Sequence, residues 1–518
     1  ASNNTAVGLS ALLSNTTGER NSAIGSFTLD ANTTGDRNVC IGSSALGSNT
    51  TASNNTAVGD NAMAANTTGA NNVAVGANAL DANTTSNNLV AIGYGALTKN
   101  TGGDNVAVGK DALEDNTSGV QNVAIGTNAL TNNTTANNNT ALGTSALTQN
   151  TTGTQNVAVG ALALDANTTG NSNTAVGYTS LGSNNTGIDN TTVGHNSLKT
   201  NTTGNNNTAL GQSALQFNTT ADDNTAIGKG ALTLNTTGSQ NVAVGANALD
   251  ANTTADANTA VGYNSLGANT DGSQNTAVGQ EALRNSTTSS RNTALGKSAL
   301  QNNTTGNENT AVGALALDAN TTGNGNTCVG ESAGTLISTG GSNNAIGRQS
   351  LLVCTSGGQN SALGVDALQS VSTGSNNIGI GHDAGRSASP SGNITTASNQ
   401  ICLGNNNHTD AFIKVAFTVT SDQRDKIEDG VVSHGLNFVN QLKPKSFWFR
   451  KNRDSDEKHG DKRYGFYAQD ILALEGSDSV VIDSRDSENL KFKGDQLIPI
   501  LVNAIKELSA KVTALEAG

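Results

Sequence analysis

The chain has 518 residues, of which 35% are hydrophobic and only 3% aromatic, so a large conventional core is hard to build from it. Its formal net charge of −13 disfavours nucleic acid and anionic membrane surfaces as partners, since phosphate groups attract clustered Lys and Arg. The sequence contains no run of ~18 apolar residues, so we predict no membrane-spanning segment. Gly, Asn, Thr and Ala dominate and the apolar residues recur periodically, which indicates a regular repeat rather than disorder.

A repeat of 17 residues with the consensus N-T-A-V-G-x-x-A-L-x-x-N-T-T-G-x-x occupies residues 1–385. The glycine that closes N-T-A-V-G recurs from Gly8 to Gly381, and one interval, from Gly93 to Gly109, has only 16 residues. This period is too short for a helical repeat or a propeller blade, and it suits one coil of a solenoid with two short strands. We expect strands at T-A-V and at A-L, and a turn at N-T-T-G because Asn and Gly tolerate left-handed backbone.

The predicted fold class is therefore mainly β, with a parallel β-roll or β-solenoid shaft. The middle residue of T-A-V is nearly always Ala, which implies a narrow space beside the strand, and the next residue is always Val, Ile or Leu. Each coil offers only about four apolar side chains, so a single ribbon is a poor core. Because solenoids gain stability by stacking neighbours, we also expect rods to associate laterally through Val or Leu, with a homotrimer as the first choice.

The N-T-A-V-G pattern resembles the head repeats of trimeric autotransporter adhesins of the YadA type, which form a left-handed parallel β-roll, and it is similar to arrays in phage-like fibre proteins. For the regular Asn and Thr residues we favour ladders of side-chain hydrogen bonds between coils. Two other interpretations stay open. The N-x-T triplets are acceptors for glycosylation, and Thr arrays can bind ice or carbohydrate, although adjacent Thr residues in a strand face opposite ways.

No metal and no cofactor is predicted. The five histidines are scattered without metal-ligand spacing, and the aspartates are too irregular for repeat-type calcium sites. The glycine-containing segment 379–385 matches neither the dinucleotide nor the Walker spacing, so we interpret it as a degenerate last coil. Cys40 and Cys328 stand where other coils have Ala, and we expect them to be small buried hydrophobic residues.

The composition changes near residue 410. Ten of the 15 aromatic residues lie at or after Phe412, and 16 of the 27 basic residues lie from Lys414 onward. A stretch with Ser, Gly and Pro before this change predicts a linker at 386–411, followed by a small α+β domain at 412–518. We expect a mixed core for this domain made of Phe438, Leu442, Phe447, Trp448, Phe449, Tyr464, Phe466 and Tyr467.

The end of the chain is predicted to be a coiled-coil-like helix. Its apolar residues are spaced four, three, four and three apart, which is a heptad pattern that suits an oligomer. Pro499 sits near the expected start, where the first turn of a helix tolerates proline. An ordinary amphipathic helix packed on its own domain is the alternative. The heptad residues are Leu501, Ile505, Leu508, Val512 and Leu515.

The motif Ser421-Asp422-Gln423-Arg424-Asp425-Lys426 resembles the S-D-x-R-x-K signature of the S74 peptidase, or intramolecular chaperone, domain of phage tailspikes and fibres. Three further segments match the family in order. They are Leu442-Lys443-Pro444, Tyr464-Gly465-Phe466-Tyr467-Ala468-Gln469-Asp470 and Leu497-Ile498-Pro499. The resemblance covers about residues 412–518.

The resemblance implies self-cleavage between Thr420 and Ser421. A Ser hydroxyl is a weak nucleophile and needs a base, and a Lys can be that base if burial keeps it neutral. Lys426 follows five residues after Ser421, so a turn could bring the two together. We therefore expect Ser421 and Lys426 to be catalytic, with Asp422 and Arg424 as structural or orienting residues.

We interpret the chain as a fibre of a virion or a similar extracellular appendage, whose C-terminal domain drives trimerisation and then cleaves itself off. The expected partner is the chain itself, with a host-surface glycan or protein receptor left open as a second one. Two alternatives are a bacterial trimeric surface adhesin and a glycosylated extracellular filament. An adhesin would need a membrane anchor after its head repeats, which the partly basic C-terminus does not resemble.

Overall fold

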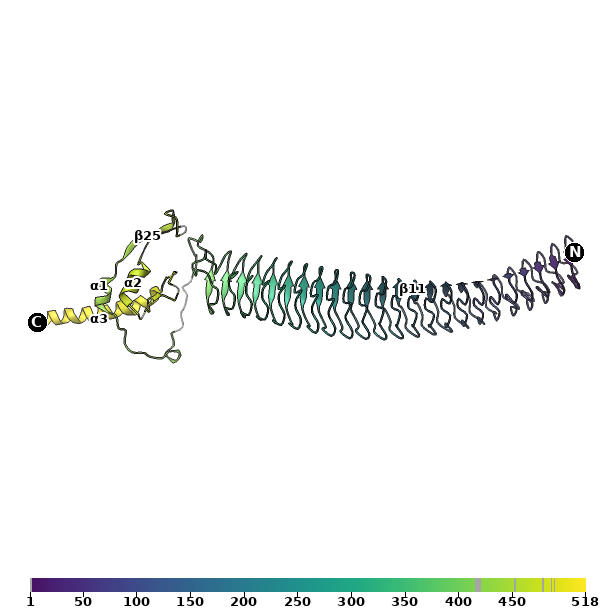
Figure 1. Ribbon diagram of the computed structural model, residues 1–518, viewed down its shortest axis with the longest axis horizontal. Coiled ribbons are helices and arrows are strands. Elements are labelled where there is room, and N and C mark those ends of the chain that lie inside the picture. Colours follow the sequence, from purple (N-terminus) through teal and green to yellow (C-terminus); the bar gives the residue numbers. More distant parts are fainter. Residues whose placement is uncertain (1, 415–420, 451–452, 478, 486, 489) are drawn as a thin grey trace.

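Most of the chain forms one long, slightly bowed solenoid, and the C-terminal residues form helices and short strands at one end of it (Figure 1). The structure is a computed structural model. It describes residues 2–414, 421–450, 453–477, 479–485, 487–488 and 490–518.

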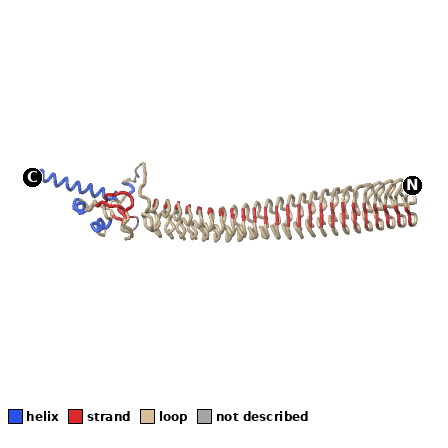
Figure 2. The backbone as a smooth tube through the Cα atoms, turned by 90° about the horizontal axis from the view of Figure 1, so that it is seen from above, coloured by secondary structure: helices blue, strands red, loops and turns tan. Residues whose placement is uncertain are grey.

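The solenoid contains one sheet of 24 strands of three residues each, and every strand pairs in parallel and in register with the next one along the chain. Figure 2 shows these strands as a single row along the shaft. This confirms the predicted parallel solenoid with its 17-residue coils. The strands are β1 Thr5–Val7, β2 Ser22–Ile24, β3 Val39–Ile41, β4 Thr56–Val58, β5 Val73–Val75, β6 Val90–Ile92, β7 Val106–Val108, β8 Val123–Ile125, β9 Thr140–Leu142, β10 Val157–Val159, β11 Thr174–Val176, β12 Thr191–Val193, β13 Thr208–Leu210, β14 Thr225–Ile227, β15 Val242–Val244, β16 Thr259–Val261, β17 Thr276–Val278, β18 Thr293–Leu295, β19 Thr310–Val312, β20 Thr327–Val329, β21 Asn344–Ile346, β22 Ser361–Leu363, β23 Ile378–Ile380 and β24 Ile401–Leu403.

Each coil has one strand, so the second strand predicted at A-L is wrong. In the coil that begins with β8, Ala129 and Leu130 lie in a turn, and Leu130 has a φ of 52°. Left-handed backbone is unusual for leucine and costs on the order of 1–3 kcal/mol. The side chain of Leu130 is completely buried, which contributes about 1.5–3 kcal/mol and offsets that cost.

The interior of a coil holds two apolar layers and two columns of asparagine. In the coil that begins with β8, the strand's middle residue Ala124 and the turn residue Leu130 are fully buried, and so are Asn122 and Asn133. The two outer residues of the strand point away from the interior, as strand alternation requires. The sequence left open which strand residues face inward, and the structure assigns that role to the middle one.

Both asparagine columns form hydrogen-bonded ladders, which confirms the favoured interpretation of the repeat. The Nδ2 of Asn133 donates to the Oδ1 of Asn116 in the preceding coil at 2.8 Å and to the carbonyl oxygen of Ala136 at 3.1 Å. In the second column, the backbone N–H of Asn139 donates to the Oδ1 of Asn122 at 3.0 Å. Such buried polar groups are tolerated because nearly all of them have a hydrogen-bond partner in a neighbouring coil or in their own turn.

The strand-ending glycine sets how closely coils stack. Gly126 has a φ of 136°, and a Cβ added there would lie 2.5 Å from the carbonyl oxygen of Gly143 in the next coil. Any other residue would push the coils apart or strain the backbone. The glycine that defines the repeat is therefore a requirement of the stacking distance.

The ladders also bear on glycosylation. In the triplet Asn133-Thr134-Thr135 the acceptor asparagine is the buried ladder residue, and its Nδ2 is already engaged in hydrogen bonds. A sugar cannot be attached to such a nitrogen while the shaft is folded. In triplets of the N-N-T type the first asparagine, such as Asn138, is exposed.

The solenoid extends beyond the predicted boundary at residue 385. The last strand, β24, lies inside the range predicted as a linker, and it pairs in parallel with β23 across a longer coil. In the final coils one asparagine column is replaced by apolar side chains, beginning with Ile337 and continuing with Cys354, Val371 and Ile394, which are all buried. The shaft therefore ends on an apolar plug in place of a polar ladder.

The C-terminal segment contains helices and two small antiparallel sheets, β25–β26 and β27–β28. The predicted small α+β unit is therefore present. Its elements are the 3-10 turn η1 Gln423–Asp425, α1 Leu436–Gln441, β25 Lys445–Arg450, β26 Lys458–Gly465, α2 Ala468–Glu475, β27 Ile482–Asp483, β28 Lys491–Phe492, the 3-10 turn η2 Gly494–Gln496 and α3 Leu497–Glu516.

The core of this segment is mostly aliphatic, so the predicted aromatic core is largely wrong. Of the predicted residues, Phe438 is buried, and Leu442 and Phe466 pack partly against it. Trp448 and Tyr464 are exposed on the β25–β26 hairpin, and the Nζ of Lys458 lies 3.9 Å from the centroid of the Trp448 ring. The buried residues are Phe438, Ile471, Val481, Ile482, Leu497 and Ile500.

Helix α3 begins at Leu497, with Pro499 in its first turn as predicted. It contacts α1 through its first half and then continues past the other elements (Figure 1). The predicted heptad residues are all exposed, from 38% for Leu501 to 82% for Leu515. The described chain therefore leaves this apolar face without a partner. Among the described residues, no helix combines the length and the apolar character needed to cross a membrane.

One break in an asparagine ladder gives a stability prediction. The buried Oδ1 of Asn269 has no hydrogen-bond partner in the described chain, because the next coil has Ser286 at the ladder position. Ser286→Asn should restore the bond and stabilise the shaft by about 1 kcal/mol, seen as a higher melting temperature in circular dichroism. Ser290→Asn is the control, since Asn171 already fills the equivalent surface position, where it accepts the N–H of Thr154. A melting temperature of Ser286→Asn at or below that of the wild type would contradict the ladder argument.

A second prediction concerns Asp318, whose pKa is raised by burial and whose Oδ1 is buried without a hydrogen-bond partner in the described chain. The folded state therefore keeps this carboxyl protonated to a higher pH than the unfolded state does. As the pH rises above the unfolded pKa the carboxyl begins to destabilise the fold, and the effect is complete above the raised pKa. Asp318→Asn should raise the melting temperature at pH 7 and lose this advantage below the unfolded pKa of ~3.9. Asp60→Asn, at an exposed aspartate, removes the same charge and should change little.

Candidate functional site

The segment 421–426 folds into a tight turn. The backbone N–H of Arg424 donates to the Oδ1 of Asp422 at 2.9 Å, so Asp422 caps the 3-10 turn η1. The N–H of Lys426 donates to the carbonyl oxygen of Gln423 at 3.1 Å and closes the turn. Asp is a strong capping residue because its carboxylate accepts from free backbone N–H groups, so the local sequence favours this shape.

The turn brings Lys426 back to Ser421. The Nζ of Lys426 donates to the Oγ of Ser421 at 2.5 Å. Serine and lysine in direct contact are the arrangement that a Ser–Lys pair needs for proton transfer. The geometry therefore brings the two residues predicted as catalytic into hydrogen-bond contact within one turn.

Asp422 and Arg424 pair with each other and not with Ser421 or Lys426. The Nη2 of Arg424 lies 2.6 Å from the Oδ2 of Asp422, and the Nε lies 3.1 Å from both carboxylate oxygens. Hydrogen bonds from Arg424 hold the pKa of the Asp422 carboxyl below its usual range. Because the Asp422 carboxylate is occupied by the guanidinium, the amine of Lys426 remains directed to the hydroxyl of Ser421.

All six residues of this turn are exposed in the described chain. A lysine acts as a base when burial or a nearby positive charge disfavours its protonated form. A single chain does not provide that burial at Lys426. Thr420, on the other side of the expected cleavage point, lies outside the described residues.

Two polar side chains of α3 hold the segment that follows the turn, and neither was singled out by the sequence. The Oε2 of Glu507 accepts the backbone N–H of Leu436 at 2.8 Å, at the start of α1. The Nδ2 of Asn503 donates to the carbonyl oxygen of His434 at 2.9 Å. The sequence signal for such a residue was its polar character on a helix with a heptad pattern. Its partner could not be predicted, because it lies about 70 residues away in sequence.

Glu475 is a second residue that the sequence did not point out. Its side chain is buried, and its carboxylate accepts three backbone N–H groups, from Val480 at 2.9 Å, Val481 at 2.6 Å and Ile482 at 3.0 Å. Hydrogen bonds to a charged acceptor are roughly twice as strong as neutral ones. Glu475 thus fixes β27 to the end of α2 and organises the core of this segment.

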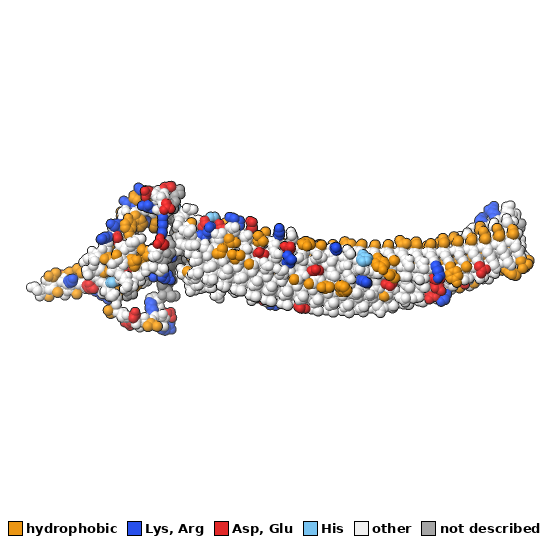
Figure 3. Space-filling view, viewed as in Figure 1, with side chains coloured by type: hydrophobic (Ala, Val, Ile, Leu, Met, Phe, Trp, Pro, Cys, Tyr) orange, Lys and Arg blue, Asp and Glu red, His pale blue; other side chains and the backbone are white. Residues whose placement is uncertain are grey.

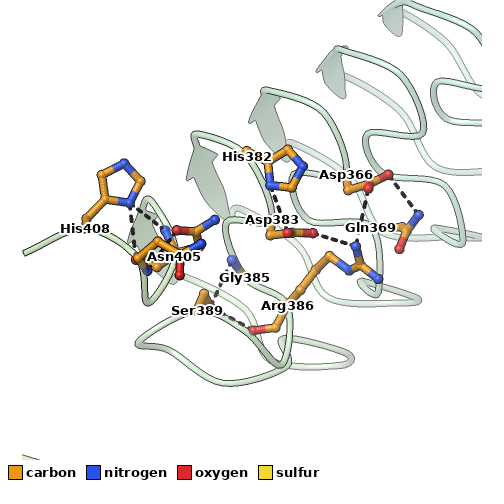
Figure 4. A network of polar contacts seen from close by, with 10 residues as sticks. Asp366, Gln369, His382, Asp383, Gly385, Arg386, Ser389, Asn405 and His408 are labelled. Carbon is orange, nitrogen blue, oxygen red and sulfur yellow. Dashed lines mark hydrogen bonds and ion pairs between the residues drawn. The ribbon is translucent and has the colours of Figure 1, made fainter. Parts of the chain in front are cut away.

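A polar network lies on the last regular coils of the shaft (Figure 4). The Nη1 of Arg386 lies 2.5 Å from the Oδ1 of Asp383 and 3.3 Å from the Oδ2 of Asp366, and the Nδ1 of His382 lies 2.8 Å from the Oδ2 of Asp383. Three potential metal ligands therefore lie close together. Arg386 already neutralises both carboxylates, so we interpret the network as a link between coils and not as a metal site.

No family model and no curated protein matches this chain at a significant level.

The role of Glu475 can be tested directly. Glu475→Gln should lower the free energy of unfolding of the C-terminal segment by about 2 kcal/mol, because it removes the charged acceptor for three backbone N–H groups. The α-helices of the described residues all lie in this segment, so the helical circular dichroism signal during urea unfolding reports on this part. Glu428→Gln, at an exposed glutamate, is the control. Equal unfolding midpoints for the two variants would contradict the assigned role.

Proposed function

We propose that this protein is the shaft of a homotrimeric fibre of a virion or a similar extracellular appendage, and that its C-terminal segment promotes trimer assembly and then cleaves the bond between Thr420 and Ser421. The elongated solenoid has the form of a fibre shaft. The observation that carries the cleavage proposal is the 2.5 Å contact between the Nζ of Lys426 and the Oγ of Ser421.

The chemistry follows from the position of Ser421 directly after the bond to be cut. A neutral Lys426 amine takes the hydroxyl proton, and the Oγ attacks the carbonyl carbon of Thr420. The peptide C–N bond breaks as a C–O ester bond forms, and the protonated amine of Lys426 supplies a proton to the released amine of Ser421. Water then hydrolyses the ester, which leaves a carboxylate on Thr420 and a free hydroxyl on Ser421. No external co-reactant other than water is needed.

The exposure of the turn suggests when cleavage happens. In one chain the side chain of Lys426 is exposed to water. Packing of a second and third copy against this segment would exclude water and favour the neutral amine. The proposal therefore places cleavage after assembly.

An apolar stripe along the shaft supports association with further copies. In all 24 strands the third residue is Val, Ile or Leu and is at least partly exposed, whereas the first residue is often Thr, Ser or Asn. Figure 3 shows a row of hydrophobic side chains along one edge of the shaft. Its area is on the order of 1,000 Å², above the ~300–600 Å² of the largest patch on a typical monomer. A second copy offers apolar groups at the same spacing along its length, which makes it a matching partner.

The C-terminal segment can set the register in which the apolar stripes of two shafts pair. Because successive coils present nearly the same surface, two shafts can pair one coil out of step with little local penalty. The exposed heptad face of α3 occurs once per chain and at one end, so its association sets a single alignment. Removing the segment afterwards makes the alignment effectively irreversible.

The proposal is tested with Ser421→Ala, Lys426→Ala and, as a control, Ser433→Ala at an exposed serine outside the turn. Intact mass and denaturing gels should show that wild type and control release residues 421–518, and that the other two variants react at least ~100-fold more slowly. Light scattering on the same samples should give trimer masses for all four proteins. Wild type that forms trimers yet stays full-length, or Ser421→Ala cleaved at the wild-type rate, would show that the cleavage proposal is wrong.

A further inference from the structure

Three exposed tyrosines recur at one position of the coil. Tyr94, Tyr178 and Tyr263 each follow a strand-ending glycine directly, after β6, β11 and β16, and their exposed fractions are 56%, 52% and 52%. The intervals are five coils each, so the rings are spaced at roughly 24 Å along the same face of the solenoid. The other two aromatic residues before residue 412, Phe27 and Phe217, occupy different positions in their coils.

The surroundings of these tyrosines recur as well. At the same position of the preceding coil each one has an alanine, namely Ala77, Ala161 and Ala246, which leaves that side of the ring uncovered. At the same position of the following coil each one has a polar side chain, namely Lys110, His195 and Gln280. The ring of Tyr178 is stacked on that of His195, with centroids 5.6 Å apart.

These polar neighbours differ from one unit to the next, while the alanine and the tyrosine do not. The same holds two coils after each tyrosine, where the residues are Thr127, Gln212 and Lys297. Substitutions on the surface change stability little, so an exposed residue without a role beyond folding is expected to vary between coils. The alanine recurs together with the whole segment around it, at 73–85, 157–169 and 242–254. The tyrosine recurs at an exposed position that is otherwise variable, which points to a role outside the fold.

An open aromatic ring beside hydrogen-bonding side chains fits the chemistry of a sugar. The C–H face of a pyranose packs on the ring, and its hydroxyl groups pair with neighbouring polar groups such as Gln280 and Asn264. The shaft is acidic, since residues 1–413 contain 23 Asp and Glu against 11 Lys and Arg, a net charge of −12. Long-range repulsion disfavours an acidic polymer, so the fitting ligand is uncharged.

We propose that Tyr94, Tyr178 and Tyr263 form a binding surface for a long, uncharged polysaccharide that runs along the shaft. One stacked ring gives weak binding, but a polymer that reaches two or three rings gains from effective concentration without any new type of contact. This inference rests on the fibre part of the proposed function and is independent of the cleavage step.

The test is electrophoresis in native gels that contain hydroxyethyl cellulose, glucomannan or dextran, with dextran sulfate as the charged comparison. We expect at least one neutral polymer to retard the wild type, and Tyr94→Ala/Tyr178→Ala/Tyr263→Ala to raise the apparent dissociation constant about tenfold or more. Phe217→Ala, which removes an exposed aromatic residue at another coil position, should bind like the wild type. Oligosaccharides too short to reach two rings should compete poorly.

A variant that is expected to bind more tightly provides a second test of the proposal. Ala314 stands in the position of Ala77, but the following coil has Glu331 in place of a tyrosine. Glu331→Tyr should therefore add a fourth ring and strengthen retardation. Wild type that no neutral polymer retards, or a triple variant that binds as well as the wild type while keeping its melting temperature, would overturn the proposal. Cleavage and trimer mass are measured on the same samples, so failure here is distinguishable from failure of the proposed function.

Discussion

The buried asparagine columns are the constraint on which the rest of the shaft depends. Each side chain bonds to the coil before it, so a coil is stable only when its neighbours repeat its geometry. The same stacking distance requires glycine at the end of the strand and leaves room only for a small residue in its middle. Because the leucines of the turn and the asparagine columns fill the interior and leave space only for the small middle residue of the strand, the larger aliphatic side chains of the strand point outward, and the shaft presents an apolar stripe to solvent.

Much of this architecture could be predicted from the sequence, since the period, the small middle residue and the regular Asn and Thr each have a direct physical meaning. The second strand could not. An Ala-Leu pair is compatible with a strand or with a turn. In the turn each of these leucines has left-handed backbone, a conformation that is unfavourable for leucine by itself. Only the burial of the leucine against neighbouring coils decides the matter, and burial is a property of the stack.

The C-terminal segment shows a different limit. The sequence placed Ser421 and Lys426 within reach of one turn, and the structure gives their contact, but the environment that would activate them is not contained in one chain. The same reason explains the aromatic residues predicted for the core. Trp448 and Tyr464 lie exposed on a two-stranded sheet, and the heptad face of α3 is exposed as well. These apolar residues are exposed in one chain, and contact with further copies in an assembly can bury them.

The coil of 16 residues between Gly93 and Gly109 shows how forgiving the stack is, because β6 and β7 keep the same pairing as their neighbours. The loss of one residue in the turn leaves the register of the strands intact, although Asn100 bonds to Gly102 of its own coil in place of Asn83. Whole coils can therefore be gained or lost while the strand pairing is kept. Length is therefore a trait that evolution can adjust in discrete steps through recombination between similar repeats. The solenoid can change its length while the C-terminal segment stays the same.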